Sequence, residues 1–494
     1  MAKDAPLTYH LDLPEKIWST LSRHLFAGDN DEHGAVIAAS VARVGGRVRL
    51  LARHVRLAVD GVDYVNGERG YRMLTANFVR DQAIFCREER LAYLAVHNHG
   101  GRARVQFSRD DLRSHERGYP ALKDITRGQI VGGVVFAENA VAGDLWLESE
   151  RTSLTSARII GQNHQELFPE PPRRPPAVSP NYDRQARLFG DRGQAMLAQQ
   201  RVGIIGLGGV GSLVCEYLVR VGVGSIIAVD PDRLDLTNLS RVVGSTQRDA
   251  LVPSAGARKS SWLKTRLGRI ARLKVDVAAR EARKVNSRIE FVRYARNVAE
   301  DSVARALLGC DFLFLAADSM QARLVFNAIV HQYLIPGVQL GAKVPVDPTT
   351  GAICRVYSVV RPVLPGQGCL WCNGLITPDG LQKEALSPDE RRAQRYVEEE
   401  DLPAPSVITL NALSASHATN YYLFRLMGLR NATTSDYMYI EPRSDVARLD
   451  APRSDPDCSE CTSAQGGRLA AGDSMRLPTQ TAVRRNPRSG RRKP

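Results

Sequence analysis

Residues 201–230 read RVGIIGLGGVGSLVCEYLVRVGVGSIIAVD and indicate the fold of the larger part of this chain. An apolar strand pattern leads into closely spaced glycines, a helical pattern follows, and a second apolar strand ends at Asp230. The glycines of this G-x-G-x-x-G turn are Gly206, Gly208, Gly209 and Gly211. Such glycines let a backbone approach phosphates, the following helix N-terminus is positive, and the acid can hold ribose hydroxyls. The stretch predicts a nucleotide-binding βαβ unit, with a purely structural βαβ turn or a nicotinamide dehydrogenase as rival interpretations.

The residues after Asp230 separate these interpretations. They read PDRLDLTNLSR, and a dehydrogenase has no need of Asn238 and Arg241 there, whereas a phosphate-polarising pair does. This stretch resembles the D-x-D-x(4)-S-N-L-x-R signature of the family of ThiF, MoeB and the ubiquitin-activating enzymes. The resemblance covers residues 182–463 and implies a Rossmann-like, doubly wound α/β domain that binds ATP and Mg²⁺.

The same family resemblance implies roles for three further residues. Tyr182-Asp183-Arg184-Gln185 is similar to the family's Y-x-R-Q motif, whose arginine reaches the ATP of the partner subunit, so Arg184 implies a homodimer. Lys274 is similar to the family lysine on the triphosphate, and Lys259 is the alternative. That choice makes residues 249–272 an inserted segment. Asp318, at the end of FLFLAAD, corresponds to the family aspartate that binds magnesium.

Two C-x-x-C pairs lie late in the chain, in GCLWCN and DCSECT. Their cysteines are Cys369, Cys372, Cys458 and Cys461. Four thiolates on two tight turns favour a closed, structural Zn²⁺ site over a redox role, and MoeB-like proteins carry the same pairs. In contrast, residues 394–411, which correspond to the family's crossover loop, contain no cysteine. Cys86, Cys215 and Cys310 lie in apolar runs typical of a core, which leaves Cys354.

A second candidate site lies in the first third of the chain. In RLAYLAVHNH, residues 90–99, the period of a strand puts His97 and His99 on one face. Ser108 is placed to cap a helix, and Asp111, one turn later, can face the histidines. Two imidazoles, a carboxylate and an open fourth position are typical of a hydrolytic zinc site, although an edge strand followed by an ordinary capping box also explains the pattern.

H-x-H followed by S-x-x-D resembles the JAMM (JAB) metallopeptidases, many of which cut bonds after ubiquitin-like proteins. The resemblance implies His97, His99 and Asp111 as ligands of a catalytic Zn²⁺, and Ser108 as oxyanion or water support. It also implies Glu32 as general base, with Asp31 adjacent. The sequence departs from the family pattern at Gly100, where a proline is usual, and by one extra residue before Ser108.

The wider sequence suggests four parts. We expect a JAMM-like α+β domain over residues 1–165, a proline-rich linker over 166–181, the ThiF/MoeB-like domain over 182–463 and a basic disordered tail over 464–494. The net charge is +14, of which the stretch from residue 466 contributes +7 through eight Arg or Lys residues against one Asp. This distribution favours a solvated tail over specific nucleic-acid binding. The start shows no signal-peptide pattern and we find no apolar span, so a cytoplasmic location without membrane insertion is expected.

Together the resemblances predict that the chain adenylates the C-terminal carboxylate of a ubiquitin-like or sulfur-carrier protein. The first domain would cleave a peptide or isopeptide bond next to the same modifier. A conjugating enzyme or a sulfur donor is the expected further partner. The alternatives are sulfur-carrier activation for cofactor or cysteine biosynthesis, peptide-antibiotic chemistry, or one head acting as a non-catalytic modifier-binding scaffold.

Overall fold

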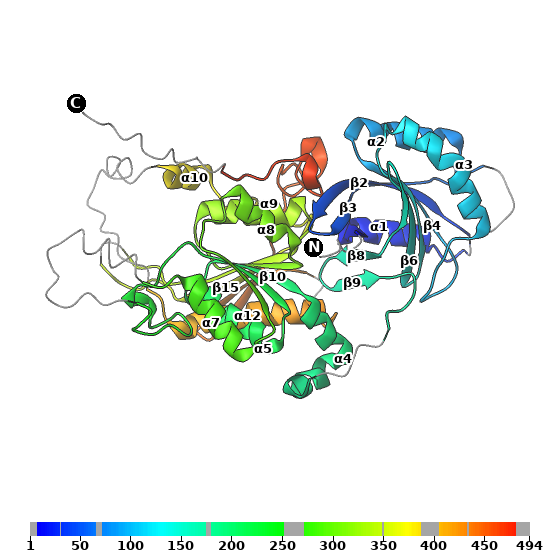
Figure 1. Cartoon of the computed structure of the whole chain (residues 1–494). Coiled ribbons are helices and arrows are strands. Elements are labelled where there is room, and N and C mark those ends of the chain that lie inside the picture. Colours follow the sequence, from blue (N-terminus) through cyan, green and yellow to red (C-terminus); the bar gives the residue numbers. More distant parts are fainter. Residues whose placement is uncertain are drawn as a thin grey trace, which may run out of the picture.

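The computed structural model describes residues 7–29, 31–65, 72–173, 179–250, 271–347, 350–386, 405–431 and 434–480. Each half of the chain forms its own sheet with helices packed on it, and the two halves lie against each other (Figure 1). The predicted α/β fold class is therefore confirmed. Within the described residues, no helix is long and apolar enough to cross a membrane.

The first sheet has nine described strands in the order β7-β6-β5-β4-β2-β3-β1-β8-β9. They are β1 (Thr8–Pro14), β2 (Gly34–Val44), β3 (Arg47–Leu57), β4 (Ala92–Asn98), β5 (Val131–Ala137), β6 (Ala140–Trp146), β7 (Arg151–Ser153), β8 (Ser156–Ile160) and β9 (His164–Leu167). The sheet mixes parallel and antiparallel pairs, since β4 runs parallel to β5 but antiparallel to β2.

Helices cover both faces of this sheet. They are α1 (Glu15–Leu25), α2 (Ala76–Glu89) and α3 (Arg109–Ile125). Because side chains alternate along a strand, Ala35 and Ile37 of β2 pack in the cluster that includes α1, whereas Val36 and Ala38 pack in the cluster that includes α2 and α3. A strand that is apolar on both sides is thus explained by two covered faces.

The second sheet has eight described strands in the order β12-β11-β10-β13-β14-β15-β16-β17. They are β10 (Arg201–Ile205), β11 (Ser225–Val229), β12 (Glu290–Tyr294), β13 (Phe312–Leu315), β14 (Gly337–Lys343), β15 (Tyr357–Val363), β16 (Tyr437–Glu441) and β17 (Val446–Asp450). The strands from β12 to β14 are parallel, and β15 to β17 continue the sheet in antiparallel pairs. The carboxyl ends of β10, β11 and β13 therefore meet at one edge.

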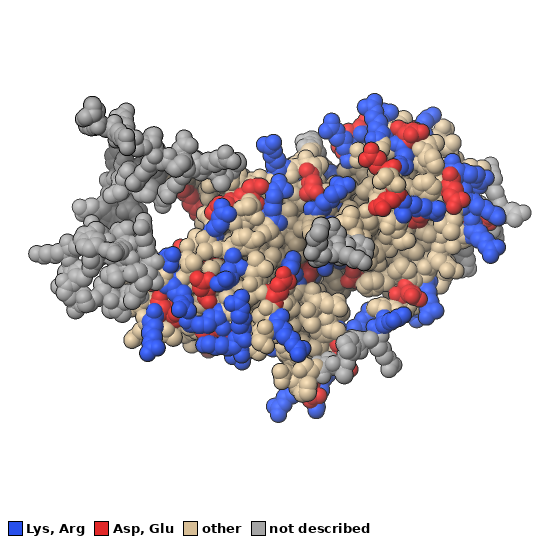
Figure 2. All heavy atoms as spheres, viewed as in Figure 1, with Lys and Arg blue, Asp and Glu red and all other residues tan. Residues whose placement is uncertain are grey.

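Helices also pack on both faces of the second sheet. One core cluster contains residues of α5 (Gly209–Val221), α7 (Lys274–Val285) and α12 (Ile408–Leu426), and the other contains residues of α8 (Asp301–Ala306) and α9 (Met320–Gln332). The remaining described elements are α4 (Asp183–Gln199), α10 (Pro378–Ala385) and the single 3-10 turns η1 (Pro180–Tyr182), η2 (Leu236–Asn238), η3 (Leu307–Gly309), η4 (Ala464–Gly466) and η5 (Gly472–Ser474). Lys and Arg side chains gather over the region of α7, with acidic side chains among them (Figure 2).

The first domain extends past the predicted boundary at residue 165. Strand β9 ends at Leu167, Phe168 bridges to Ala140, and the Val105 amide donates to the Pro169 carbonyl at 3.0 Å. Residues 166–169 thus belong to the first sheet rather than to a linker, because their backbone groups find partners there. The η1 turn and the start of α4 also fall within or next to the expected linker, while residues 174–178 lie outside the described residues.

The disordered tail expected from residue 464 is also wrong for residues 464–480. Ala470 and Leu477 are buried in a core cluster shared with the second domain. Arg53 of β3 donates to the carbonyls of Leu469 and Gly467 at 2.5 and 2.7 Å, and the Arg43 amide donates to Asp473. This C-terminal strap, residues 464–480, spans both domains, and residues 481–494 lie outside the described residues.

Apolar contacts also join the two domains directly. Ala42, Leu51 and Ile160 of the first domain are buried in the same cluster as Val303 and Tyr333 of the second. Polar groups add to this contact, since Arg49 donates to the Tyr333 carbonyl at 2.7 Å. The two domains therefore share a core instead of meeting only through their connecting segment.

Candidate functional site

The glycine turn between β10 and α5 has the geometry that its sequence predicts. Gly206 has φ +91°, a region that side chains disfavour, and a Cβ at Gly211 would lie 1.9 Å from the Gly206 carbonyl oxygen. The carboxylate of Asp230 accepts from the Leu207 amide at 2.7 Å and from the Asp232 amide at 2.8 Å. Asp230 thereby ties the tip of β11 to the turn.

A cavity of about 870 Å³ opens at the carboxyl edge of the second sheet. Its lining includes Gly206, Gly208, Gly209, Asp230, Asp232, Lys274, Asn297, Asp318, Arg323, Gln339, Lys343, Arg361, Ser406 and Asn411. The crevice outside the strand ends is where open α/β sheets bind ligands, and the volume suits a nucleotide. We refer to it as the nucleotide cleft.

Lys274 lies in this cleft, whereas Lys259 is outside the described residues. The Lys274 ammonium donates to Asp232 at 2.7 Å and lies 3.9 Å from Asp230. Burial raises the pKa of the Asp230 carboxyl, and the nearby charge of Lys274 offsets this rise only in part. The lysine charge is thus offset by two carboxylates, which a triphosphate would replace as its partners.

Arg241 lies next to the glycine turn, whereas Asn238 lies in the η2 turn. A Cβ at Gly209 would be 3.2 Å from Arg241 Cδ, so the arginine lies over the glycine turn. Neither Asn238 nor Arg241 is among the residues that line the cleft. The side-chain oxygen of Asn238 accepts from the Asp235 amide at 3.3 Å and completes the capping box of η2. In this structure Asn238 supports the loop that carries Arg241 rather than facing the nucleotide.

Asp318 lines the cleft from the short segment between β13 and α9. The next residue, Ser319, caps α9 by accepting from the Ala322 amide. Glu384 of α10 also accepts from the backbone amides of Met320 and Gln321 at 2.5 and 3.0 Å. Asp318 itself is held between these capped segments, among the residues that line the cavity.

Arg323 and Arg361 also line the nucleotide cleft, and neither was predicted from sequence. Burial lowers the pKa of Arg323, with Arg361 adding to the effect, and the Nε of Arg323 has no hydrogen-bond partner among the described residues. Arg361 donates to Gln339 at 2.5 Å and lies over the ring of Tyr439. Neither residue lies in a local motif, so their location depends on which strands the sheet brings together.

Arg184 does not reach the cleft of its own chain. Gln185 of the same motif is anchored to Gln194 and to the Val221 carbonyl at 2.6 and 2.7 Å. Arg184 is exposed near the start of α4, and no partner for it is found in the described part of the chain. Leu188, one turn further, is 62% exposed.

The four cysteines of the C-x-x-C pairs come together at one point. Sγ to Sγ distances are 3.5 Å for Cys369–Cys372, 3.8 Å for Cys369–Cys458 and 3.7 Å for Cys372–Cys461. Four sulfurs each about 2.3 Å from a central Zn²⁺ would be roughly 3.8 Å apart. The cluster therefore has the dimensions of a tetrahedral zinc site.

His97, His99 and Asp111 form the second cluster. Their Nε2 and carboxylate atoms are 3.2 to 3.6 Å apart, and the capping box predicted at Ser108 and Asp111 is present. Because the Gln106 carbonyl 3.0 Å away can only accept, His99 Nδ1 carries the proton and Nε2 offers its lone pair to the centre. Ser108 donates from both its hydroxyl and its amide to Asp111 at 2.7 Å, so its hydroxyl orients that carboxylate.

Glu32, not Asp31, faces this cluster. Its carboxylate lies 3.7 Å from His99 Nε2, whereas Asp31 forms an ion pair with Arg72 at 2.6 Å. Asn98, between the two histidines, accepts from the His33 amide at 2.7 Å and thus fixes the segment that carries Glu32. Burial raises the pKa of the Glu32 carboxyl, and the charges of His97 and His99 offset only part of this rise. The carboxylate is therefore a stronger base than that of a free glutamate.

Known proteins match parts of this chain. Mouse adenylyltransferase and sulfurtransferase MOCS3 is 30% identical over 38% of the chain and 40% of its own length. The Escherichia coli tRNA threonylcarbamoyladenosine dehydratase is 29% identical over 36% of the chain and 60% of itself, and the Bacillus subtilis sulfur carrier protein ThiS adenylyltransferase is 28% identical over 39% and 49%. The chain thus spans about half the length of these relatives.

A solved structure, Escherichia coli MccB with ATP, is 19% identical over 57% of the chain and 75% of its own, with a TM-score of 0.41. The ThiF family model matches residues 182–460, which hold the glycine turn, the nucleotide cleft and three of the four clustered cysteines, with Cys461 one residue beyond. With more than half of its length matched in this way, the chain belongs to the ThiF family.

Proposed function

We propose that the second domain adenylates the C-terminal carboxylate of a ubiquitin-like or sulfur-carrier protein, with ATP and Mg²⁺ as the other reactants. The observation that carries this proposal is the nucleotide cleft, which brings the glycine turn, Lys274 and Asp318 to one cavity. Similarity to adenylyltransferases, two of which are named above, supports it.

In this reaction a carboxylate oxygen attacks the α-phosphorus of ATP and the bond to the bridging β-phosphate oxygen breaks, so that pyrophosphate leaves. The Gly208 amide, Arg241 and Lys274 would offset the developing phosphate charge. Asp230 would hold the ribose, and Asp318 would supply an oxygen ligand for Mg²⁺. Arg323 and Arg361 add positive charge to the wall of the cleft, which suits the approaching carboxylate of the partner protein.

Exchange of labelled pyrophosphate into ATP tests this function, with a panel of ubiquitin-like and sulfur-carrier proteins as partners. We expect exchange that depends on the partner's free C-terminus and that falls roughly 100-fold or more in Lys274→Ala. Lys284→Ala is the matched control, since Lys284 is on the same helix but pairs with Glu281 at the surface. Partner-independent exchange, or full exchange in Lys274→Ala, would contradict the proposal.

We also propose that the ATP site is completed by a second copy of the chain. Arg184 is an exposed motif residue that does not line its own cleft, and the exposed Leu188 offers apolar surface one helical turn away. A symmetric dimer would place each Arg184 toward the cleft of the other subunit.

For the first domain we propose a zinc-dependent peptidase that cuts next to the same modifier. His97, His99 and Asp111 would hold the ion, which supplies Lewis-acid chemistry when bound. Glu32 would take a proton from the attacking water and return it to the leaving amine. Asp111 is held in place by Ser108, and oxyanion support by that serine stays a prediction.

Cleavage of a modifier that carries a C-terminal peptide extension tests the peptidase. Glu32→Gln should lower the rate by roughly 10²- to 10⁴-fold, while the neighbouring Asp31→Asn serves as the control because Asp31 is paired with Arg72. Equal loss in both variants, or cleavage that persists in His99→Ala, would refute the site.

A further inference from the structure

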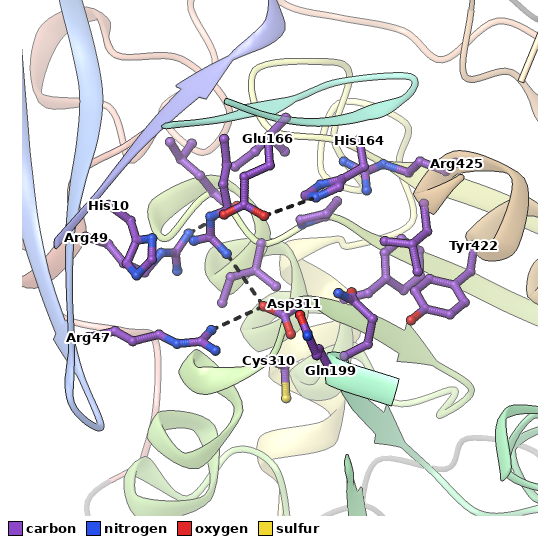
Figure 3. Close-up of a pocket in the computed structure, with 18 of the residues that line it drawn as sticks. His10, Arg47, Arg49, His164, Glu166, Gln199, Cys310, Asp311, Tyr422 and Arg425 are labelled. Carbon is purple, nitrogen blue, oxygen red and sulfur yellow. Dashed lines mark hydrogen bonds and ion pairs between the residues drawn. The ribbon is translucent and has the colours of Figure 1, made fainter. Parts of the chain in front are cut away.

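A cavity of about 220 Å³ lies between the two domains, away from both sites described above (Figure 3). The first domain lines it with side chains of β1, β3, β8 and β9, and the second with the end of α4, the start of β13 and the C-terminal half of α12. The cavity is smaller than typical pockets for drug-sized ligands or nucleotides. Only a small molecule or ion fits it.

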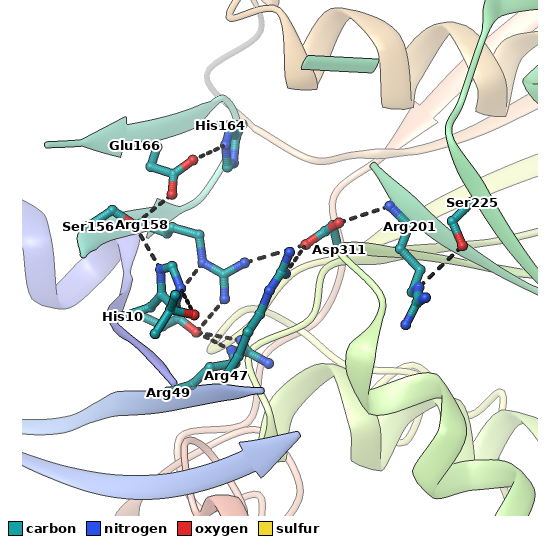
Figure 4. Close-up of polar contacts among 12 residues, drawn as sticks. His10, Arg47, Arg49, Ser156, Arg158, His164, Glu166, Arg201, Ser225 and Asp311 are labelled. Carbon is teal, nitrogen blue, oxygen red and sulfur yellow. Dashed lines mark hydrogen bonds and ion pairs between the residues drawn. The ribbon is translucent and has the colours of Figure 1, made fainter. Parts of the chain in front are cut away.

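Most of the charges around this cavity are paired (Figure 4). The buried carboxylate of Asp12 accepts from Arg49 at 2.6 Å and from Arg158 at 2.7 Å. Asp311 lies 3.5 Å from both Arg47 and Arg158, and so links the two domains. Three guanidinium groups thus share two carboxylates.

Arg425 of α12 is the exception. It is 3% exposed, its Nε donates to the Gly161 carbonyl at 3.0 Å, and its Nη2 has no partner among the described residues. The charge of Glu15 raises the pKa of Arg425 from a distance, but no ion pair joins the two residues in the described part of the chain. The hydroxyl of Tyr422, 1% exposed on the same helix and also lining the cavity, likewise has no partner there.

The remaining polar groups do not supply the missing negative charge. Glu166 accepts from Ser156 at 2.6 Å and lies 4.0 Å from His164. Burial lowers the pKa of His10 to about 4 and that of His164 to about 3, so both imidazoles are neutral near pH 7. Four arginines against Asp12, Asp311 and Glu166 leave one excess positive charge around the cavity.

Buried charges in proteins are almost always paired, and buried donors are almost always bonded. We propose that this cavity binds a small oxyanion, inorganic phosphate or sulfate, which accepts hydrogen bonds from Arg425 and Tyr422. Because Arg425 belongs to the adenylating domain and the opposite wall belongs to the first domain, the anion bridges the two. A hydrogenphosphate could also donate its proton to Glu166, which sulfate cannot do.

Isothermal titration calorimetry of the full chain, in buffer free of both anions, tests the proposal with inorganic phosphate and inorganic sulfate as separate probes. We expect one saturable site whose affinity falls roughly 10-fold in Tyr422→Phe and at least roughly 100-fold in Arg425→Met. Tyr422→Phe preserves the shape of the core, so it decides the question if Arg425→Met does not fold. Arg220→Met is the charge-matched control, because Arg220 is exposed and pairs with Glu216.

Phosphate can also enter the nucleotide cleft, which Lys274→Ala distinguishes. Binding that survives Lys274→Ala and weakens in Tyr422→Phe supports the interdomain site, and the tighter of the two probes identifies the ion. Binding that is lost in Lys274→Ala and unchanged in Tyr422→Phe places the anion in the nucleotide cleft and overturns the proposal. The absence of saturable binding of either ion shows that water fills the cavity, and overturns it equally.

Discussion

Subunit complementation gives the sharpest test of the dimeric ATP site. Arg184 is exposed and without a partner in the described part of its own chain, so Arg184→Ala should leave the fold of the isolated subunit unchanged. In the dimer it would remove one charge-assisted bond to a phosphate, worth about 1.5 to 3 kcal/mol, and so lower pyrophosphate exchange roughly 10- to 150-fold. Asp318→Ala should remove exchange by weakening Mg²⁺ binding in the same chain.

Mixing equal amounts of the two variants should restore part of the activity. Random association makes half of the dimers hybrids, and each hybrid has one cleft with an intact Asp318 that receives Arg184 from the other subunit. Exchange should therefore recover to about a quarter of the wild-type value. Mass spectrometry of the mixture, with one variant isotopically labelled, verifies that hybrids have formed.

Two results would refute this reasoning. If hybrids form and exchange stays at the level of the single variants, Arg184 does not act across the interface. If Arg184→Ala alone keeps full exchange, the arginine has no role in the ATP site. Arg187→Ala is the control, since Arg187 lies on the same helix but pairs with Asp183 at the surface.

Three further predictions concern metal, stability and the fate of the adenylate. Elemental analysis should find about two zinc ions per chain, with one lost in Cys369→Ser and the other, more exchangeable, in His99→Ala; full content in His99→Ala would contradict the second site. Burial raises the pKa of Asp12, but Arg158 and Arg49 outweigh it and hold the pKa at about 2, below the ordinary 3.8. The resulting stability, about 2 kcal/mol, is therefore present above pH 4 and lost as the pH falls through 2. Asp12→Asn should destabilise the protein at neutral pH by roughly 3 to 5 kcal/mol, seen as a lower Tm, while Asp60→Asn at an exposed pair should cost under about 1 kcal/mol; equal shifts would contradict this. Finally, incubation with modifier and ATP should give no thiol-sensitive adduct on non-reducing gels, because residues 394–411 lack cysteine; an adduct that disappears in Cys354→Ala would refute this.

The parts of both sites that depend on local sequence could be predicted well. The glycine turn requires its glycines within six residues, and the Ser108 cap with Asp111 is formed inside one helical turn. The convergence of His97 and His99 follows from the period of a strand. Each of these features is fixed by residues close in the chain, so pattern and stereochemistry are sufficient.

The features that sequence did not predict depend on distant partners. Arg72, which pairs with Asp31 across 41 residues of sequence, lies in no motif that would mark it. The ordering of residues 464–480 depends on the apolar surface that Ala470 and Leu477 meet in the folded molecule. Arg425 looks like any basic residue near a helix end until the first domain closes over it.

The shared core of Ala42, Leu51 and Ile160 with the second domain has a consequence for how this protein can be dissected. A proline-rich linker usually suggests two domains that fold independently of each other. Here, however, a protease cut between residues 174 and 178 should leave a nicked complex that still elutes as one species, because apolar contacts, Arg49 and the C-terminal strap hold the halves together. Expressing residues 1–173 alone would instead expose that apolar surface to water, so the isolated fragment should be prone to aggregation where the nicked protein is not.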